Sequence, residues 1–180
     1  MVKPTPTQLE GVAIGRETGV AVGSDLTHKA PIAREAGFDV EKYAQRLDPA
    51  HEALTALSVS SETLKAFKAG YATAGVHRGR LALPIHDCNG ACIAYFGRSL
   101  KEESPLLLFP NGVNPSEHIF GAHQVEPGEL YLVRDPLQVL TASENGVTNV
   151  VSFLAPITPQ MLEMLAALCD EKKVESIELF

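Results

Sequence analysis

The chain has 180 residues, of which 45% are hydrophobic, and its 22 acidic and 15 basic side chains give a formal net charge of −7. This charge argues against indiscriminate nucleic-acid binding by the protein as a whole. The sequence has no apolar run as long as a membrane span and no signal peptide, and its three cysteines lack the spacing of a disulfide framework. We therefore expect a cytoplasmic protein without a membrane partner, folded as one domain or as a domain with an appendage.

Residues 1–37 predict a flexible leader. Glycines recur from Gly11 to Gly23 among short apolar patches and three prolines, without a sustained period. The part from Gly15 to Gly23 lacks both the Gly-Lys-Ser/Thr ending of a phosphate-binding loop and the spacing of a dinucleotide fingerprint.

Residues 38–57 predict two short helices that are separated at Asp48-Pro49, because proline disfavours a helical residue before it. A further helix is expected to begin after Ser60, whose hydroxyl can cap it. Gly70 is expected to close this helix.

Residues 79–97 predict a β-hairpin. Apolar side chains at positions 81, 83 and 85 alternate with other residues, and Asn89-Gly90 is a strong hairpin-turn signal. Pro84 is expected to lie at a sheet edge or next to an irregularity, because it has no N–H to donate.

The basic side chains cluster around this hairpin. Positions 65–101 contain one acidic residue, Asp87, and six basic ones: Lys65, Lys68, Arg78, Arg80, Arg98 and Lys101. A local cationic surface is what binding to a phosphate backbone requires, since released counterions supply much of that affinity. The alternative is an ordinary solvated face.

Histidines and cysteines in this region are candidate metal ligands. His118 and His123 lie in a loop-rich segment, and Cys88 and Cys92 flank the predicted turn near His86. Neither group shows a complete ligand set at convincing spacing, so we expect ordinary histidines, free thiols and no zinc.

Residues 129–180 predict the order strand, helix, strand, helix, strand. Asp135-Pro136 and Thr158-Pro159 each combine an N-cap residue with proline at the first helical position. Strands joined by single helices are expected to pair in parallel, and ligands of such sheets lie at the carboxyl ends of the strands. The predicted fold class is thus α/β: an N-terminal α+β subdomain with a β-hairpin (38–125), followed by a partial βαβαβ parallel sheet (126–180).

The order of these segments resembles a known family. Residues 57–71, 79–90 and 94–98 are similar to the catalytic core of bacterial DnaG-type DNA primases, and more closely to primase-like proteins of mobile elements that carry a CHC2 zinc finger and a Toprim domain. Residues 119–124 then resemble the segment that leads into the Toprim strands. The resemblance implies a truncated Toprim-like subdomain at 126–180, a role in DNA replication, and nucleic-acid contacts from Arg80 and Arg98.

The resemblance fails at the catalytic metal site. Active relatives hold Mg²⁺ with a glutamate after the first Toprim strand and an Asp-x-Asp pair after the third, because Mg²⁺ prefers oxygen ligands. Here Arg134 stands at the glutamate position, followed by Asp135, and the sequence reaches Phe180 where the aspartates should follow. We expect a degenerate site with no catalytic residue and no cofactor, in which Asp135 serves as an N-cap.

The sequence therefore predicts a primase-like protein that binds single-stranded or primed DNA through the basic hairpin surface and is catalytically inactive. The alternative is an interaction subunit for a replication partner protein, or one half of a split primase that a partner chain completes. The motivation for this alternative is the final strand, residues 174–180, which would present an open sheet edge.

Overall fold

The computed structural model describes residues 38–101 and 104–180. The predicted leader, residues 1–37, lies outside the described residues. The elements in chain order are α1 (Val40–Ala44), β1 (Leu47–Asp48), the 3₁₀ helix η1 (Glu52–Leu57), α2 (Ser61–Ala66), β2 (Gly70–Ala72), β3 (Arg80–His86), β4 (Cys92–Ser99), β5 (Leu107–Leu108), the 3₁₀ helix η2 (Pro115–Glu117), β6 (Ile119–Phe120), the 3₁₀ helix η3 (Ala122–Gln124), β7 (Gly128–Val133), α3 (Pro136–Glu144), β8 (Val150–Phe153), α4 (Pro159–Lys172) and β9 (Val174–Leu179).

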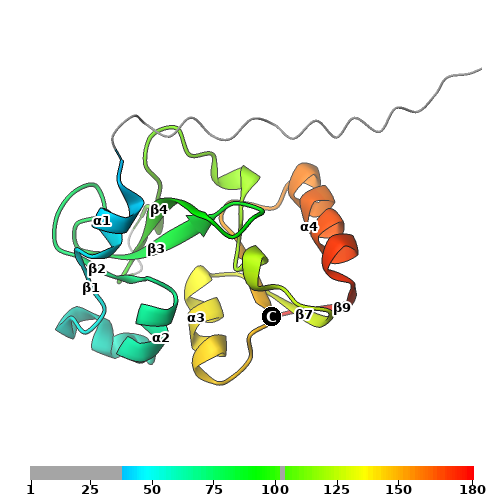
Figure 1. The fold of residues 1–180 in the computed structure, drawn as a ribbon, viewed down its shortest axis with the longest axis horizontal. Coiled ribbons are helices and arrows are strands. Elements are labelled where there is room, and N and C mark those ends of the chain that lie inside the picture. The colour runs from blue at the N-terminus through cyan, green and yellow to red at the C-terminus, as the bar shows by residue number, and fades with distance from the viewer. Residues whose placement is uncertain (1–37, 102–103) are drawn as a thin grey trace, which may run out of the picture. The chain divides into compact units, whose positions relative to one another are not determined.

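The first sheet is antiparallel, in the order β1-β2-β3-β4-β5, and the predicted hairpin forms its centre as β3 and β4 (Figure 1). In the connecting turn the carboxylate of Asp87 accepts hydrogen bonds from the backbone N–H groups of Asn89 and Ala91. Strand β2 pairs with β3 only as far as Ala82. Pro84 therefore lies beyond the end of β2 and close to a register shift after Ile85, so its missing N–H leaves the β2–β3 pairing intact.

The segment before the hairpin differs from the prediction in two places. The two short helices are present as α1 and η1, but the strand β1 forms between them. Ser60 caps α2 as expected, its Oγ accepting a hydrogen bond from the N–H of Thr63. The helix ends before Gly70, with Lys68 in the left-handed conformation. Gly70 instead begins β2, where a Cβ would lie only 3.0 Å from the Leu47 side chain, so glycine permits the close approach of β1.

The second sheet has the order β6-β8-β7-β9, in which β7 pairs in parallel with both β8 and β9. Both predicted helix starts are confirmed. Asp135 forms a capping box with Gln138, and the Thr158 hydroxyl accepts a hydrogen bond from the N–H of Met161. The short antiparallel strand β6, from residues 119–120, was not predicted. The mixed α/β fold class is confirmed, whereas the division into subdomains at residue 125 stays a prediction.

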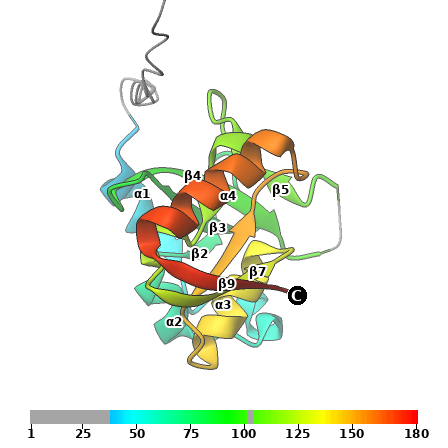
Figure 2. The ribbon, with the colours of Figure 1, turned by 90° about the vertical axis from the view of Figure 1, so that its right-hand side faces the viewer.

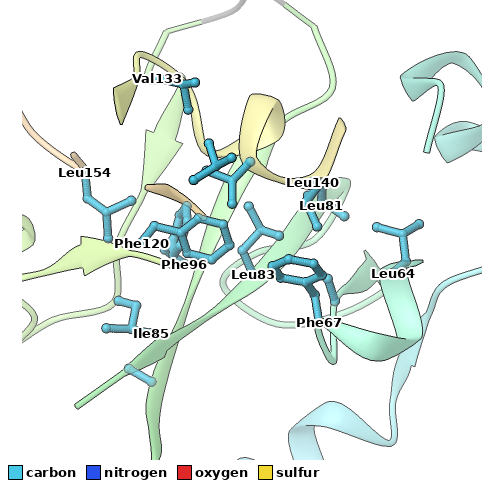
Figure 3. Packing of buried hydrophobic residues seen from close by; sticks show 14 of the residues in the cluster. Leu64, Phe67, Leu81, Leu83, Ile85, Phe96, Phe120, Val133, Leu140 and Leu154 are labelled. Atoms are coloured by element: carbon cyan, nitrogen blue, oxygen red, sulfur yellow. The ribbon is translucent and has the colours of Figure 1, made fainter. Parts of the chain in front are cut away.

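The main hydrophobic cluster joins the two sheets (Figure 3). Leu81, Leu83 and Phe96 from the hairpin pack with Leu140 of α3 and with Phe120 of β6 in this cluster. Helices α2 and α3 lie side by side next to it (Figure 1). Burial of this apolar surface, at roughly 25 cal/mol per Å², makes the packing of α3 and the second sheet against the hairpin a major stabilising contact.

Two further hydrophobic clusters lie on the faces of the two sheets that point away from the main cluster. Helix α4 packs on the face of the second sheet that lies away from α3, through Met161 and Leu165 (Figure 2). On the first sheet, Ala82 and Tyr95 face α1, because neighbouring residues of a strand point to opposite faces. Within residues 38–101 and 104–180, no helix is both long enough and apolar enough to cross a membrane.

Candidate nucleic-acid interface

Arg98 lies buried at the junction of the two sheets. It stands opposite Leu81 in the hairpin and therefore points toward the main hydrophobic cluster. Its Nη2 lies 2.7 Å and its Nε 3.3 Å from Oδ2 of Asp135, and its Nη1 donates to the carbonyl oxygen of Ser99 at 2.6 Å. The side chains of Arg98 and Asp135 are 6% and 21% exposed, so this ion pair is largely withdrawn from water.

Asp135 has two roles at this junction. Its Oδ1 accepts a hydrogen bond from the N–H of Leu137 at 2.9 Å, which confirms the predicted N-cap of α3, while its Oδ2 accepts from Arg98. A carboxylate at a helix N-terminus is also favoured by the helix dipole. Sequence reasoning missed the ion pair, since its partners lie 37 residues apart. The alternation of the strand, which puts Phe96 and Arg98 on one face, could have shown that Arg98 points inward.

Arg80 points to the opposite face of the first sheet from Arg98. It stands opposite Ser99, one position along from the pair of Leu81 and Arg98. Its Nη1 donates to the carbonyl oxygens of Pro105 at 2.8 Å and of Leu106 at 3.4 Å, so the side chain ties the strand start to that loop. The two arginines that the family resemblance placed on one surface are therefore separated by the sheet.

The other basic residues also divide between different places. Arg78 is exposed in the turn before β3, and Lys101 is exposed directly after β4. Lys65 is exposed on α2. Lys68 lies 3.6 Å from Glu41 of α1, which offsets its charge. The structure does not bring the six predicted residues to one surface, and their contact with nucleic acid stays a prediction.

Arg134 is exposed at the carboxyl end of β7, immediately before Asp135. Its backbone N–H donates to Oε1 of Gln138 at 3.1 Å, so the capping box fixes the backbone there. The guanidinium group thus sits at the strand end where ligands of parallel sheets bind. This is the position at which the resemblance expected a metal-binding glutamate.

The carboxyl end of β7 does not fit a Mg²⁺ site. Both oxygens of Asp135 already accept hydrogen bonds, one from the helix backbone and one from Arg98. The guanidinium of Arg98, 2.7 Å from Asp135, disfavours a second cation there. Among residues 38–101 and 104–180 no group of three or more His, Cys, Asp or Glu side chains could hold a metal ion.

The histidines and cysteines near the hairpin turn form packing contacts. His86 stacks on His123 with ring centroids 3.7 Å apart, and burial, together with the charge of His123, lowers the pKa of His86 to about 4. Burial raises the pKa of the Cys92 thiol to about 11, so the thiolate form that zinc requires is disfavoured. Cys88 is exposed.

Comparison with known sequences shows likeness to primases. No family model matches the chain. A protein of Legionella pneumophila named DNA primase is 34% identical over 91 residues, which cover 46% of this chain and 16% of that protein. A DNA primase of Enterobacteria phage T4 is 32% identical over 69 residues, which cover 38% of this chain and 20% of that protein. The chain thus spans about a fifth or less of the length of these relatives.

The fold is that of the primase catalytic core. The DnaG primase catalytic domain bound to single-stranded DNA matches with a TM-score of 0.62 and 17% identity, over 77% of this chain and 58% of that one. The RNA polymerase domain of Mycobacterium tuberculosis DnaG in complex with double-stranded DNA matches with a TM-score of 0.62 and 18% identity, over 77% and 60%. A DNA primase domain from Pseudomonas aeruginosa matches with a TM-score of 0.63 and 18% identity, over 77% and 59%. The predicted likeness to DnaG-type primases is confirmed.

The Arg98–Asp135 pair can be tested by a double-mutant cycle. Asp135→Asn keeps an N-cap acceptor but removes the carboxylate charge beside the buried guanidinium of Arg98, so we expect the free energy of unfolding to fall by about 3 kcal/mol. Combining it with Arg98→Met removes the buried arginine charge as well and should recover part of that loss. Urea unfolding of the wild type, both single variants and the double variant measures the coupling.

Arg134→Met is the matched control, because it removes an exposed arginine next to the pair. Its unfolding free energy should change by no more than about 0.5 kcal/mol. If Asp135→Asn proved as mild as this control, the ion pair would not be the contact that joins the sheets.

Proposed function

We propose that this DnaG-type primase-like protein binds single-stranded or primed DNA during DNA replication and does not synthesise primers itself. The observation that supports binding is the fold, which is shared with primase domains solved with single-stranded and double-stranded DNA. The observation against synthesis is the arginine at the carboxyl end of β7, beside a carboxylate that is already engaged.

The proposed DNA contact begins where β4 and β7 end. The Arg98–Asp135 pair joins these strand ends, so Lys101, three residues after Arg98, and Arg134, adjacent to Asp135, flank one junction. Both side chains are exposed. Cations at the carboxyl end of a parallel strand are well placed to contact phosphates.

The remaining basic residues are assigned different weights. Arg78 and Arg80 extend the contact from the start of β3. Nη1 of Arg80, however, already donates hydrogen bonds to the carbonyl oxygens of residues 105–106. Arg98 holds Asp135, the neighbour of Arg134, in place through the ion pair. Its own side chain is too buried to contact a phosphate backbone. Lys65 and Lys68 lie outside this junction, and Lys68 is beside Glu41, so both should contribute least.

The first measurement is the fluorescence anisotropy of labelled single-stranded DNA over a range of salt. We expect binding that weakens steeply with salt, because each phosphate contact releases condensed counterions. Lys101→Glu and Arg134→Glu should each weaken binding by roughly tenfold or more and make the salt dependence shallower.

Lys42→Glu, on the exposed surface of α1, makes the same change in net charge away from the junction and serves as the control. It should have a much smaller effect than either junction variant. Equal losses in all three variants would show that binding follows net charge alone, and absence of binding at low salt would contradict the proposal.

Primer synthesis is tested separately, on the same preparation that binds DNA. With Mg²⁺, ribonucleoside triphosphates and a single-stranded template we expect no oligoribonucleotide product on a denaturing gel, because nucleotidyl transfer needs clustered carboxylates to hold the metal ions. Oligoribonucleotide product that depends on Mg²⁺ would overturn this part of the proposal.

A second candidate function is self-association through β9, an edge strand of the described sheet. Its apolar side chains Ile177 and Leu179 are exposed, as is Phe180 after it, and unpaired strand edges favour pairing with another chain. A protein that uses this edge should show a concentration-dependent mass above 19.3 kDa by light scattering, and Ile177→Lys should return it to monomer.

Leu162→Lys on α4 is the control for that experiment, since Leu162 is also an exposed apolar residue but lies off the strand edge. If the wild type stayed monomeric at all concentrations, pairing of β9 with a second copy of the chain would be excluded.

A further inference from the structure

Three histidines surround one small crevice at the tip of the hairpin. His86 ends β3, His118 precedes β6 and His123 belongs to η3. The other residues that line the crevice are Ile85, Ile119, Phe120, Gly121 and Leu154. The hairpin tip therefore meets the segment around β6 through imidazole rings.

His86 and His123 form a direct stack. Their ring centroids lie 3.7 Å apart, and the angle between the ring planes is 30°. A Cβ added at Gly90, in the hairpin turn, would lie 3.8 Å from Cβ of His123, so the turn itself also approaches η3. Two neutral rings attract each other at this distance, whereas two protonated rings repel each other.

His118 adds a buried nitrogen to the group. Its Nε2 has no hydrogen-bond partner among the described residues. A neutral imidazole donates from one ring nitrogen, whereas a protonated imidazole donates from both. Protonation of His118 would therefore require Nε2 to donate where these residues offer no acceptor, which costs free energy.

Burial keeps His86 neutral in the folded protein. It lowers the pKa of His86 to about 4, with further lowering by the charges of His123 on η3 and Lys68 after α2. The carboxylate of Asp87 acts in the opposite direction, but it already accepts hydrogen bonds from two backbone N–H groups of the turn. Cys92, the β4 partner of His86, contributes no charge, because burial raises the pKa of its thiol to about 11.

The same effect acts on the other two rings. Burial lowers the pKa of His118, although the charge of Glu117 on η2 opposes this shift. Burial, followed by the charge of Lys172 on α4, lowers the pKa of His123. The three rings are therefore neutral together near pH 7, because the neighbouring carboxylates do not outweigh burial.

We propose that His86, His118 and His123 form a pH switch, which holds the hairpin tip against β6 and η3 while the rings are neutral and releases it when they are protonated. The Arg98–Asp135 pair lies at the other end of the hairpin, so the base of the hairpin stays in place when the tip opens. The switch does not depend on the DNA contact proposed at the strand ends.

The direction of the pH effect follows from the lowered pKa of His86. When the tip is open, a histidine binds its proton at about pH 6.5, whereas His86 in the closed tip binds it only at about pH 4. Between these two values the open tip holds a proton that the closed tip lacks. The closed tip is therefore fully favoured above about pH 6.5 and is progressively lost as the pH falls toward about 4.

Hydrogen exchange of the full chain at about pH 7 and about pH 5 tests the switch, after correction for the intrinsic pH dependence of exchange. A suitable probe is the N–H of Asp87, which donates to the carbonyl oxygen of Ala91 in the turn. Its protection should fall roughly tenfold at the lower pH, because each histidine with a lowered pKa favours the open tip there. Equal protection at both pH values would overturn the proposal.

Urea separates opening of the tip from unfolding of the whole chain. Local opening exposes little surface, so low concentrations of urea should leave the protection of Asp87 at the lower pH almost unchanged. The N–H of Tyr131, which donates to the carbonyl oxygen of Asn149 beside the second sheet, is the comparison. If both amides lost protection with urea equally steeply, the histidines would destabilise the whole fold, and the proposed switch would be wrong.

His86→Phe combined with His123→Phe keeps two rings at the stack but removes their protonation. The protection of the turn amides in this variant should lose most of its pH dependence, and His86→Phe alone should lose part of it. A wild-type pH dependence in the double variant would overturn the proposal. If the double variant does not fold, the single variant and the wild type decide the question.

His51→Phe is the matched control. His51 also stacks on an aromatic ring, that of Tyr71 at a centroid distance of 3.8 Å, but it does not line the crevice. The turn amides of this variant should keep the pH dependence of the wild type. Equal loss of the pH dependence in His51→Phe and in the double variant would show that the crevice is not its source.

Discussion

The buried ion pair between Arg98 and Asp135 is the contact on which the arrangement of the two sheets depends. Arg98 is the last inward-facing side chain of the hairpin, and Asp135 is the N-cap residue of α3. Removing the carboxylate of Asp135 takes away an ionic partner of Arg98 at a site that is largely withdrawn from water, which should cost stability. One carboxylate therefore fixes the start of a helix and the position of the hairpin against it at the same time.

Hydrophobic packing around this pair also holds the two sheets together. The main cluster contains side chains from the hairpin, from α2, from α3 and from the second sheet (Figure 3). Hydrogen bonds from Ser60 at the start of α2 to Glu144 at the end of α3 add a second tie, at 2.9 Å from both its N–H and its hydroxyl. The strand ends that carry Lys101 and Arg134 are thus held by polar contacts at both ends of α3 and by apolar contacts between them.

Strand alternation gives the first sheet two different surfaces. The inward face carries Arg98 and the main core, whereas the outward face carries Arg80 and also Tyr95, which packs next to α1. Gly97 belongs to this outward face, where a Cβ would lie 2.9 Å from the Arg80 side chain and 3.0 Å from His77.

The sequence by itself determined the local features of this protein: the hairpin at Asn89-Gly90, the capped helix starts at Asp135-Pro136 and Thr158-Pro159, the parallel βαβαβ order and the primase likeness. These depend on turn chemistry, capping and periodicity over a few residues, which a linear pattern can show. Tertiary structure alone decided that Gly70 begins a strand and that Asp135 pairs with Arg98. Each of these depends on which segments distant in sequence approach one another, because burial and ion pairing are set by packing and no local pattern encodes them.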